Sequence, residues 1–277
     1  MRRSILAAAA AAFLLSAPAV AEDVLKTAVD GTFAPHAMPK LSGGIEGFNV
    51  DLADALARQL NKKITVDAAQ FSGLLPALQA GTYDFIVAPV TVTKERAENL
   101  LFTEGYLNTD FQFITKADAP DITKLEDLKG KVVSVNKGSA YDSWARGLEE
   151  KIGWKVESYG TQTDAVQAVL SGRADANVAG NTAIQWAAKS NPQIKLSYLY
   201  STGLVWAIAL RKDSAELRKT LDQAVECLKT DGTIAKLHEK WFGTKPAPGS
   251  AAVTVFAGYG VPDMPGYDPT VHQLACK

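Results

Sequence analysis

Short runs of apolar and β-branched residues alternate along the chain with segments whose apolar residues recur every three or four positions. The first pattern is typical of strands, and the second is typical of helices that bury one face. Their alternation indicates an α/β fold rather than an all-helical or all-strand one. In the first part of the chain it predicts strands at 24–29, 64–69 and 84–88, and helices at 51–62, 74–81 and 94–100.

The pattern starts again after Tyr106. Two similar α/β units in one chain suggest two lobes, although the repeat is one of architecture and not of sequence. The second unit is predicted to hold strands at 110–116, 131–138 and 155–160, a helical turn at 125–130, helices at 139–153 and 181–190, and a helix that changes to a strand at Gly172 within 163–180.

Helix starts are predicted at two polar positions. Thr93 precedes "KERAENL" and has the side-chain oxygen that an N-cap needs. Asp213, with Glu216 three residues later, predicts a capping box for a long helix in the segment 204–243. The periodicity leaves open which lobe that segment packs on.

The N-terminus predicts export. Arg2 and Arg3 precede a short alanine-rich apolar run, and Ala19-Val20-Ala21 offers the small residues that signal peptidase requires. We therefore expect residues 1–21 to be a signal peptide cleaved after Ala21, followed by a soluble mature chain. The run is too short for a membrane span, and no cysteine follows it that could carry a lipid anchor.

Charge and length narrow the function. Removal of the two arginines of the leader changes the formal charge from −1 to −3, so nothing favours binding to nucleic acid or to an acidic membrane surface. The 277-residue chain would keep 256 residues, enough for one large domain or two modest lobes.

The two cysteines, Cys227 and Cys276, are expected to pair, because an oxidising compartment favours a disulfide. The bridge would close a loop of about 50 residues, worth about 3–4 kcal/mol in the chain-entropy description. Its predicted role is to hold the Gly- and Pro-rich tail, 244–277, on a helix. The three histidines are scattered without ligand spacing, so no metal site is expected.

Arg96 lies in the first turn of a predicted helix, where the helix dipole disfavours a positive charge. Helix-end N–H groups, a threonine hydroxyl and a planar guanidinium would together suit a carboxylate, with the arginine bound bidentately. The alternative is a solvated helix residue, which is the commoner case for an arginine taken alone.

Five motifs occur in a fixed order: "GFNVDLADALARQL", "FSGLLPALQAGTYDFIVAPVTVTKERAENLLFTEGYL", "GKVVSVNKGSAYDSW", "AVLSGRADANVAGNTAI" and "LRKDSAELRKTLDQAVECLKTDGTIAKLHEKWFG". Together they resemble the family 3 periplasmic solute-binding proteins, which feed amino acids to ABC importers. The resemblance covers about residues 24–243. It implies a two-lobed Venus-flytrap fold (type II) with two crossover hinge strands, in which closure buries a ligand between the lobes. On that template, residues 22–107 with 206–243 would form lobe 1, and residues 110–203 would form lobe 2.

The resemblance also implies a ligand site. Arg96 matches the arginine that clamps the ligand carboxylate, and Thr91 matches the hydroxyl residue beside it. Each matched residue has a structural alternative: the aromatic residues could be core, Thr91 a strand-end hydroxyl, and the acid a turn former. The matched set is completed by Asp30 at the end of the first strand, the aromatic residues Phe33 and Phe71, the strand residue Ala88, the loop residues Ser139 and Ala140 of lobe 2, and the pair Gly180 and Asn181.

Two positions depart from the family pattern. Gly180 stands where relatives commonly carry an aspartate that pairs with the α-ammonium, and Asn181 beside it offers only a neutral amide. Pro89 lacks a backbone N–H that relatives often supply. The ligand is therefore expected to be an amino acid held differently, or a carboxylate without an α-ammonium.

The leading functional hypothesis is a substrate-binding component of an ABC importer, present in the periplasm as a monomer, with a membrane permease as partner and no cofactor. An enzyme on the same scaffold, such as a cyclohexadienyl dehydratase, needs a general acid in the cleft, and Asp30 alone supports it weakly. We therefore expect no enzymatic activity. A sensory subunit that presents its ligand to a receptor is the other alternative.

Overall fold

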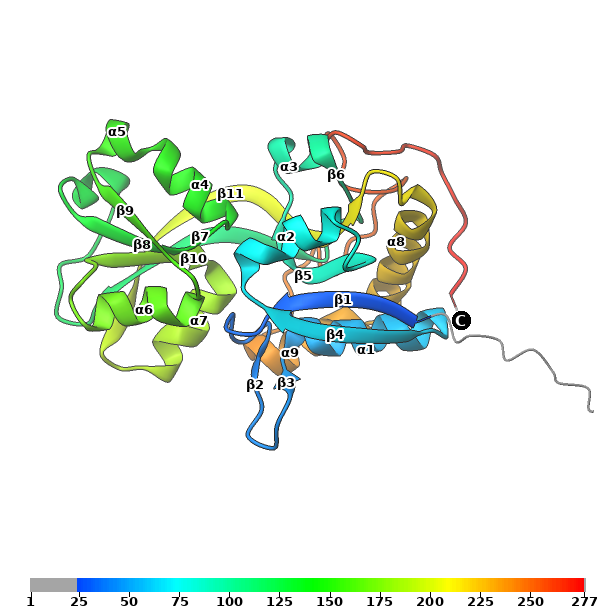
Figure 1. The fold of residues 1–277 in the computed structure, drawn as a ribbon, viewed down its shortest axis with the longest axis horizontal. Coiled ribbons are helices and arrows are strands. Elements are labelled where there is room, and N and C mark those ends of the chain that lie inside the picture. The colour runs from blue at the N-terminus through cyan, green and yellow to red at the C-terminus, as the bar shows by residue number, and fades with distance from the viewer. Residues whose placement is uncertain (1–23, 277) are drawn as a thin grey trace, which may run out of the picture.

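The computed structural model describes residues 24–276 and consists of two α/β lobes joined by strands (Figure 1). The predicted signal peptide, residues 1–21, and its cleavage site therefore lie outside the described residues. No helix within residues 24–276 is long and apolar enough to cross a membrane.

The first lobe is built around a parallel pair of strands and a mixed sheet. β1 pairs in parallel with β4, and β5 and β6 both pair antiparallel with the long strand β11 (Ile194–Arg211). Its elements are β1 Val24–Asp30, β2 Met38–Pro39, β3 Ile45–Glu46, α1 Phe48–Leu60, β4 Lys63–Ala69, α2 Phe71–Gln79, β5 Phe85–Thr91, α3 Lys94–Asn99, β6 Leu100–Phe102, α8 Ala215–Thr230 and α9 Thr233–Phe242.

The second lobe continues the same sheet in the order β11-β7-β10-β8-β9, with helices on its two faces (Figure 1). Strands β8, β9 and β10 run parallel to one another, while β7 is antiparallel to β10. Its elements are the 3-10 turn η1 Leu125–Leu128, β8 Val132–Asn136, α4 Ala140–Gly147, α5 Glu149–Ile152, β9 Lys155–Tyr159, α6 Gln162–Leu170, β10 Ala176–Gly180 and α7 Asn181–Ser190.

Two antiparallel strands connect the lobes. β7 (Leu107–Lys116) and the 18-residue β11 (Ile194–Arg211) pair from Ile194 opposite Lys116 to Trp206 opposite Leu107. Their register shifts twice, between Leu196 and Leu199 and between Tyr200 and Leu204. The two-lobed α/β fold with crossover strands is therefore confirmed.

Most predicted elements are present, and Thr93 caps α3 as expected, since its hydroxyl accepts a hydrogen bond from the Arg96 N–H at 3.3 Å. The predicted capping box is wrong. Helix α8 begins one residue later, with Ser214 at its N-cap and no side-chain cap, because the Asp213 carboxylate binds Ser214 Oγ and Arg211 instead. The helix predicted at 139–153 is interrupted after Gly147, a poor helix former.

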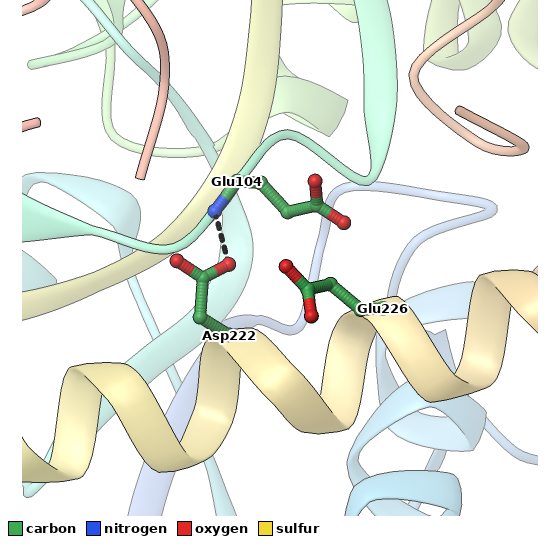
Figure 2. A group of neighbouring side chains, drawn as sticks. All are labelled: Glu104, Asp222 and Glu226. Carbon is green, nitrogen blue, oxygen red and sulfur yellow. Dashed lines mark hydrogen bonds between the residues drawn. The ribbon is translucent and has the colours of Figure 1, made fainter. Parts of the chain in front are cut away.

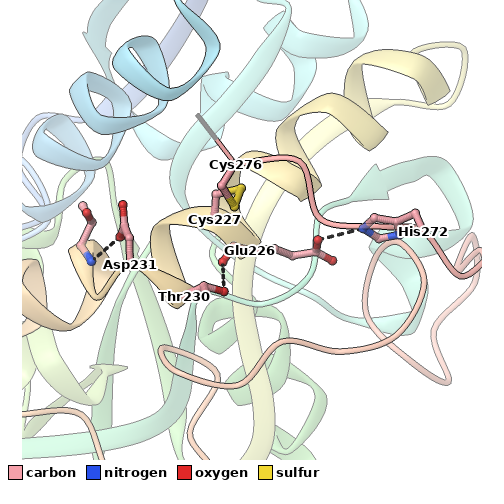
Figure 3. The surroundings of a disulfide bond; sticks show 7 residues. Glu226, Cys227, Thr230, Asp231, His272 and Cys276 are labelled. Carbon is pink, nitrogen blue, oxygen red and sulfur yellow. Dashed lines mark hydrogen bonds and ion pairs between the residues drawn. A yellow bond between two sulfur atoms is a disulfide. The ribbon is translucent and has the colours of Figure 1, made fainter.

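The C-terminal tail packs on helix α8, and the predicted Cys227–Cys276 bridge is present (Figure 3). Close to the bridge, Glu226 Oε2 pairs with His272 Nε2 at 2.8 Å, and the His272 ring stacks on Tyr259 at 4.1 Å between centroids. The tail thus has polar and stacking contacts of its own besides the covalent link.

The bridge should stabilise the fold by restricting the unfolded chain. Cys276→Ser is expected to lower the free energy of unfolding by about 3–4 kcal/mol, and with it the melting temperature by several degrees. Differential scanning calorimetry of the variant and of the wild type with and without reductant measures this. Equal melting temperatures in the oxidised and reduced wild-type protein would contradict a stabilising bridge.

Candidate functional site

A small cavity lies where the two lobes meet, at the ends of β1 and β5. The cavity has a volume of about 10 Å³, room for no more than a single water molecule. The lobes are therefore closed in this structure, and a larger solute can enter only if they separate. The lining residues are Asp30, Phe33, Phe71, Pro89, Thr91 and Trp206 from the first lobe and Ser139, Ala140 and Tyr141 from the second.

Strand pairing places Thr91 beside Trp206. The two residues are register partners in β5 and β11, and the indole N–H of Trp206 donates to Thr91 Oγ1 at 3.0 Å. Because that hydroxyl oxygen already accepts, its proton remains available to donate to an anionic oxygen. Pro89, which cannot donate a backbone hydrogen bond, lies in β5 where the pairing with β11 shifts register between Ala207 and Ala209.

Arg96 extends from α3 toward the second lobe. Its guanidinium donates to the carbonyl oxygen of Thr91 at 3.0 Å and to that of Gly138 at 3.1 Å, and it lies 5.7 Å from the centre of the Phe71 ring. Burial lowers the pKa of Arg96 to about 10, so it stays charged at neutral pH. Within residues 24–276 no carboxylate forms an ion pair with it. The site therefore offers a desolvated cation without a counter-ion.

Asp30 holds the opposite charge. This buried carboxylate accepts hydrogen bonds from the backbone N–H and hydroxyl of Thr32 through Oδ1, and from the Asn136 side chain of the second lobe at 2.8 Å through Oδ2. No cationic side chain forms an ion pair with Asp30 among the described residues. The cavity is thus lined by an uncompensated acid and approached by an uncompensated arginine.

The second lobe contributes the start of α4. Ser139 caps this helix by accepting from the Asp142 N–H at 3.1 Å, and the neighbouring Gly138 has φ +77°. A β-carbon at Gly138 would lie 3.2 Å from the Cα of Ser72 in α2, so a glycine allows this loop to approach the first lobe. Burial, reinforced by the charge of Asp30, raises the pKa of the Tyr141 hydroxyl, which stays protonated.

Four of the ten residues expected from the sequence are not among those that line the cavity. Arg96 lies next to it, since its guanidinium donates to the carbonyl oxygen of the lining residue Thr91. Ala88 is buried in an apolar cluster with Phe71. Gly180 packs against the indole of Trp206, and Asn181, at the start of α7, keeps a buried Oδ1 without a hydrogen-bond partner. The roles of all ten residues as ligand contacts remain predictions.

The sequence did not predict two of the lining residues, Tyr141 and Trp206. Pro89 was singled out only because it lacks a backbone N–H donor. Tyr141 lies in the quoted motif "GKVVSVNKGSAYDSW", next to the expected Ser139 and Ala140, so its position in the first turn of a helix was the available signal. Trp206 carries no such signal, because its hydrogen-bond partner in the cavity, Thr91, lies in β5, 115 residues away in sequence.

His36 links the lobes beside the cavity. Its Nδ1 lies 2.8 Å from Asn49 Oδ1, and its Nε2 lies 2.8 Å from the hydroxyl of Thr182 in α7. Since the Asn49 amide nitrogen donates elsewhere, to the Val87 carbonyl and the Tyr106 hydroxyl, its oxygen must accept from Nδ1–H. Burial lowers the pKa of His36 to about 4, so the ring is neutral at pH 7.

A second group of ionisable residues lies away from the cavity, under the tail (Figure 2). Glu104, Asp222 and Glu226 are all buried, with carboxylate oxygens within 4.8 Å of one another. Burial raises the pKa of Asp222 to about 7, and Lys229 Nζ lies 2.7 Å from Glu104 Oε1 and also donates to the Thr254 carbonyl. A lysine therefore supplies the positive charge here, and the group serves to attach the tail.

The fold and the cavity define a two-lobed α/β protein that holds a small solute between its lobes. Residues 25–244 match the bacterial extracellular solute-binding proteins, family 3, and the chain belongs to this family. It is 30% identical to ABC transporter arginine-binding protein 1 of Escherichia coli (strain K12) over 87% of this chain and 99% of that protein.

Solved structures agree. An ancestral arginine-binding protein bound to arginine superposes with a TM-score of 0.76 and 35% identity, covering 79% of this chain and 98% of that chain. An ancestral amino-acid-binding protein described as a precursor of cyclohexadienyl dehydratase superposes with a TM-score of 0.72 and 30% identity, covering 79% and 95%.

The neutral state of His36 predicts an acid-sensitive fold. Because its folded-state pKa is depressed from 6.5 to about 4, its contribution to stability is complete above pH 6.5 and is lost as the pH falls toward 4. The free energy of unfolding should fall by up to about 1.4 kcal/mol per pH unit in that window. Urea unfolding of wild type and His36→Gln at several pH values measures it, with the difference between the two curves isolating the histidine. Parallel curves would contradict this assignment.

Proposed function

We propose that this protein is the substrate-binding component of an ABC importer, and that it captures a small carboxylate-bearing solute by closing its two lobes. The family and the amino-acid-binding relatives support this function. The observation that carries it is the Arg96 guanidinium, which extends from the first lobe to the Gly138 carbonyl of the second with no acidic partner among the described residues.

The binding step follows from the charges. A ligand carboxylate would replace the carbonyl contacts of Arg96 with a bidentate, charge-assisted pair, and it could also accept from the Thr91 hydroxyl. Backbone N–H groups at the start of α4 lie in the second lobe, close to Gly138, and favour an anion. A solute held by both lobes binds the closed state more tightly than the open one, and this difference shifts the population toward closure.

The same proposal includes the bounds of the two lobes, the cellular compartment and the partner. Lobe 1 comprises 22–107 with 206–243, lobe 2 comprises 110–203, and the tail 244–277 is an addition to the family fold. The protein acts in the periplasm after cleavage at Ala21. It works as a monomer. It delivers its ligand to a membrane permease, in keeping with its similarity to an ABC transporter component of Escherichia coli.

An enzyme is the second candidate, because one similar structure is a precursor of cyclohexadienyl dehydratase. A dehydratase needs a proton donor that can reach its substrate. Both oxygens of Asp30 already accept hydrogen bonds, and the raised pKa of Tyr141 makes its hydroxyl a weak acid. These features favour binding without turnover, and incubation with a cyclohexadienyl carboxylate, followed by ultraviolet absorbance, tests it.

Loss of Arg96 should abolish high-affinity binding. Arg96→Ala removes one partner of a buried charge pair, which costs about 3 kcal/mol or more, equivalent to about a 100-fold weaker affinity. A thermal-shift screen of amino acids, ω-amino acids and simple carboxylates identifies ligands of the wild type, and titration calorimetry with the best of them measures the loss.

The matched control is Arg58→Ala, which removes an equal charge from the exposed face of α1. It should bind as tightly as the wild type. Undiminished affinity in Arg96→Ala, with its melting temperature preserved, would overturn the carboxylate-clamp assignment.

A further inference from the structure

We propose that the site selects carboxylates that lack an α-ammonium and carry their positive charge at the far end, as ω-amino and ω-guanidino acids do. This inference rests on the proposed function and names the solute class of the same cavity. It starts from Gly180, the position where an acid for the α-ammonium was expected and is missing.

Trp206 fills the space that a side chain at position 180 would need. A β-carbon built on Gly180 would lie 2.3 Å from Cζ2 and 2.5 Å from Cη2 of the indole, far inside van der Waals contact. The indole is one of the largest fully buried side chains of the described chain, and its edge contacts with Phe33 and His36 hold it in place. The position of the Trp206 indole therefore requires a glycine at position 180, and no acidic side chain fits there.

The Thr91 hydroxyl is partly engaged by the same indole. The Thr91 oxygen accepts the indole N–H of Trp206, so the hydroxyl faces a ligand chiefly as a donor. A donor suits the carboxylate that Arg96 attracts, and it does not suit an ammonium. The cavity wall formed by Thr91 and Trp206 therefore favours the carboxylate and an apolar carbon chain over an α-amino group.

A cation still has a place in the cavity, at Asp30. This buried carboxylate lines the cavity with no ion-pair partner in residues 24–276, and a buried unpaired charge is unfavourable. The aromatic rings of Phe33 and Phe71 lie in the same wall and suit a methylene chain between two charged ends. The arrangement thus matches a ligand with a carboxylate at one end and an ammonium or guanidinium at the other.

The test compares solutes that differ by one charge at a time. One series is pentanoate, 5-aminopentanoate and ornithine; the second is hexanoate, 6-aminohexanoate and lysine; the third is pentanoate, 5-guanidinopentanoate and arginine. Titration calorimetry on the full mature chain should show the ω-charged acid bound at least 10-fold more tightly than both other members of at least one series.

The outcomes separate the two proposals. Tighter binding of ornithine, lysine or arginine than of its deamino partner, lost in Arg96→Ala, overturns this inference and leaves the proposed function standing. Equal binding of pentanoate and 5-aminopentanoate overturns the role of Asp30. Failure of every carboxylate in all three series to bind overturns both the inference and the carboxylate-receptor function.

A pair of variants tests the mechanism. Gly180→Asp combined with Trp206→Ala restores an acid and the room for it, and should shift preference at least 10-fold toward the α-amino member of the series. Gly180→Asn with Trp206→Ala has the same shape without the charge and should not shift it. Circular dichroism checks that both variants are folded. If either is unfolded, the comparison of the three solute series in the wild-type protein decides the inference. An equal shift in both variants would contradict the assignment.

Discussion

The proposed function depends on a half-buried positive charge with which no carboxylate of residues 24–276 forms an ion pair. Arg96 is held by carbonyl oxygens of Thr91 and Gly138 and by the face of Phe71, all of which orient the guanidinium without cancelling its charge. A desolvated cation of this kind is unfavourable until an anion arrives. The proposed capture of a carboxylate by the closing lobes rests on that imbalance.

Other polar contacts also join the lobes near the cavity. Asn136 donates to Asp30, and Thr182 donates to the neutral ring of His36. Hydrogen bonds like these exchange with water at little net gain, about 1 kcal/mol each. They can hold the closed form in register without making it permanent. Such a balance suits a receptor, because a ligand then supplies the additional affinity that shifts the population toward closure.

Local sequence patterns predicted much of this fold. Contacts that depend on the pairing of distant strands could not be predicted from them. The Thr93 cap and the pairing of Cys227 with Cys276 needed only residue types and spacing. The capping box failed because Arg211, close in sequence but outside the helix, competes for Asp213. Trp206 was beyond reach, since its place in the cavity depends on the pairing of β11 with β5, 115 residues away in sequence.

Gly180 and Trp206 depend on each other, because the indole occupies the space that an acidic side chain at position 180 would need. A glycine at position 180 without Trp206 would leave an open space where a carboxylate could stand. The Trp206 indole fills that space, since a β-carbon built on Gly180 would lie only 2.3 Å from its Cζ2 atom. The indole N–H also donates to the Thr91 oxygen, so this hydroxyl faces the cavity chiefly as a donor. One large residue and one glycine therefore change the cavity from a site for two opposite charges on one carbon into a site for charges at two ends. Asp30, which neither change affects, keeps a buried carboxylate in the cavity wall.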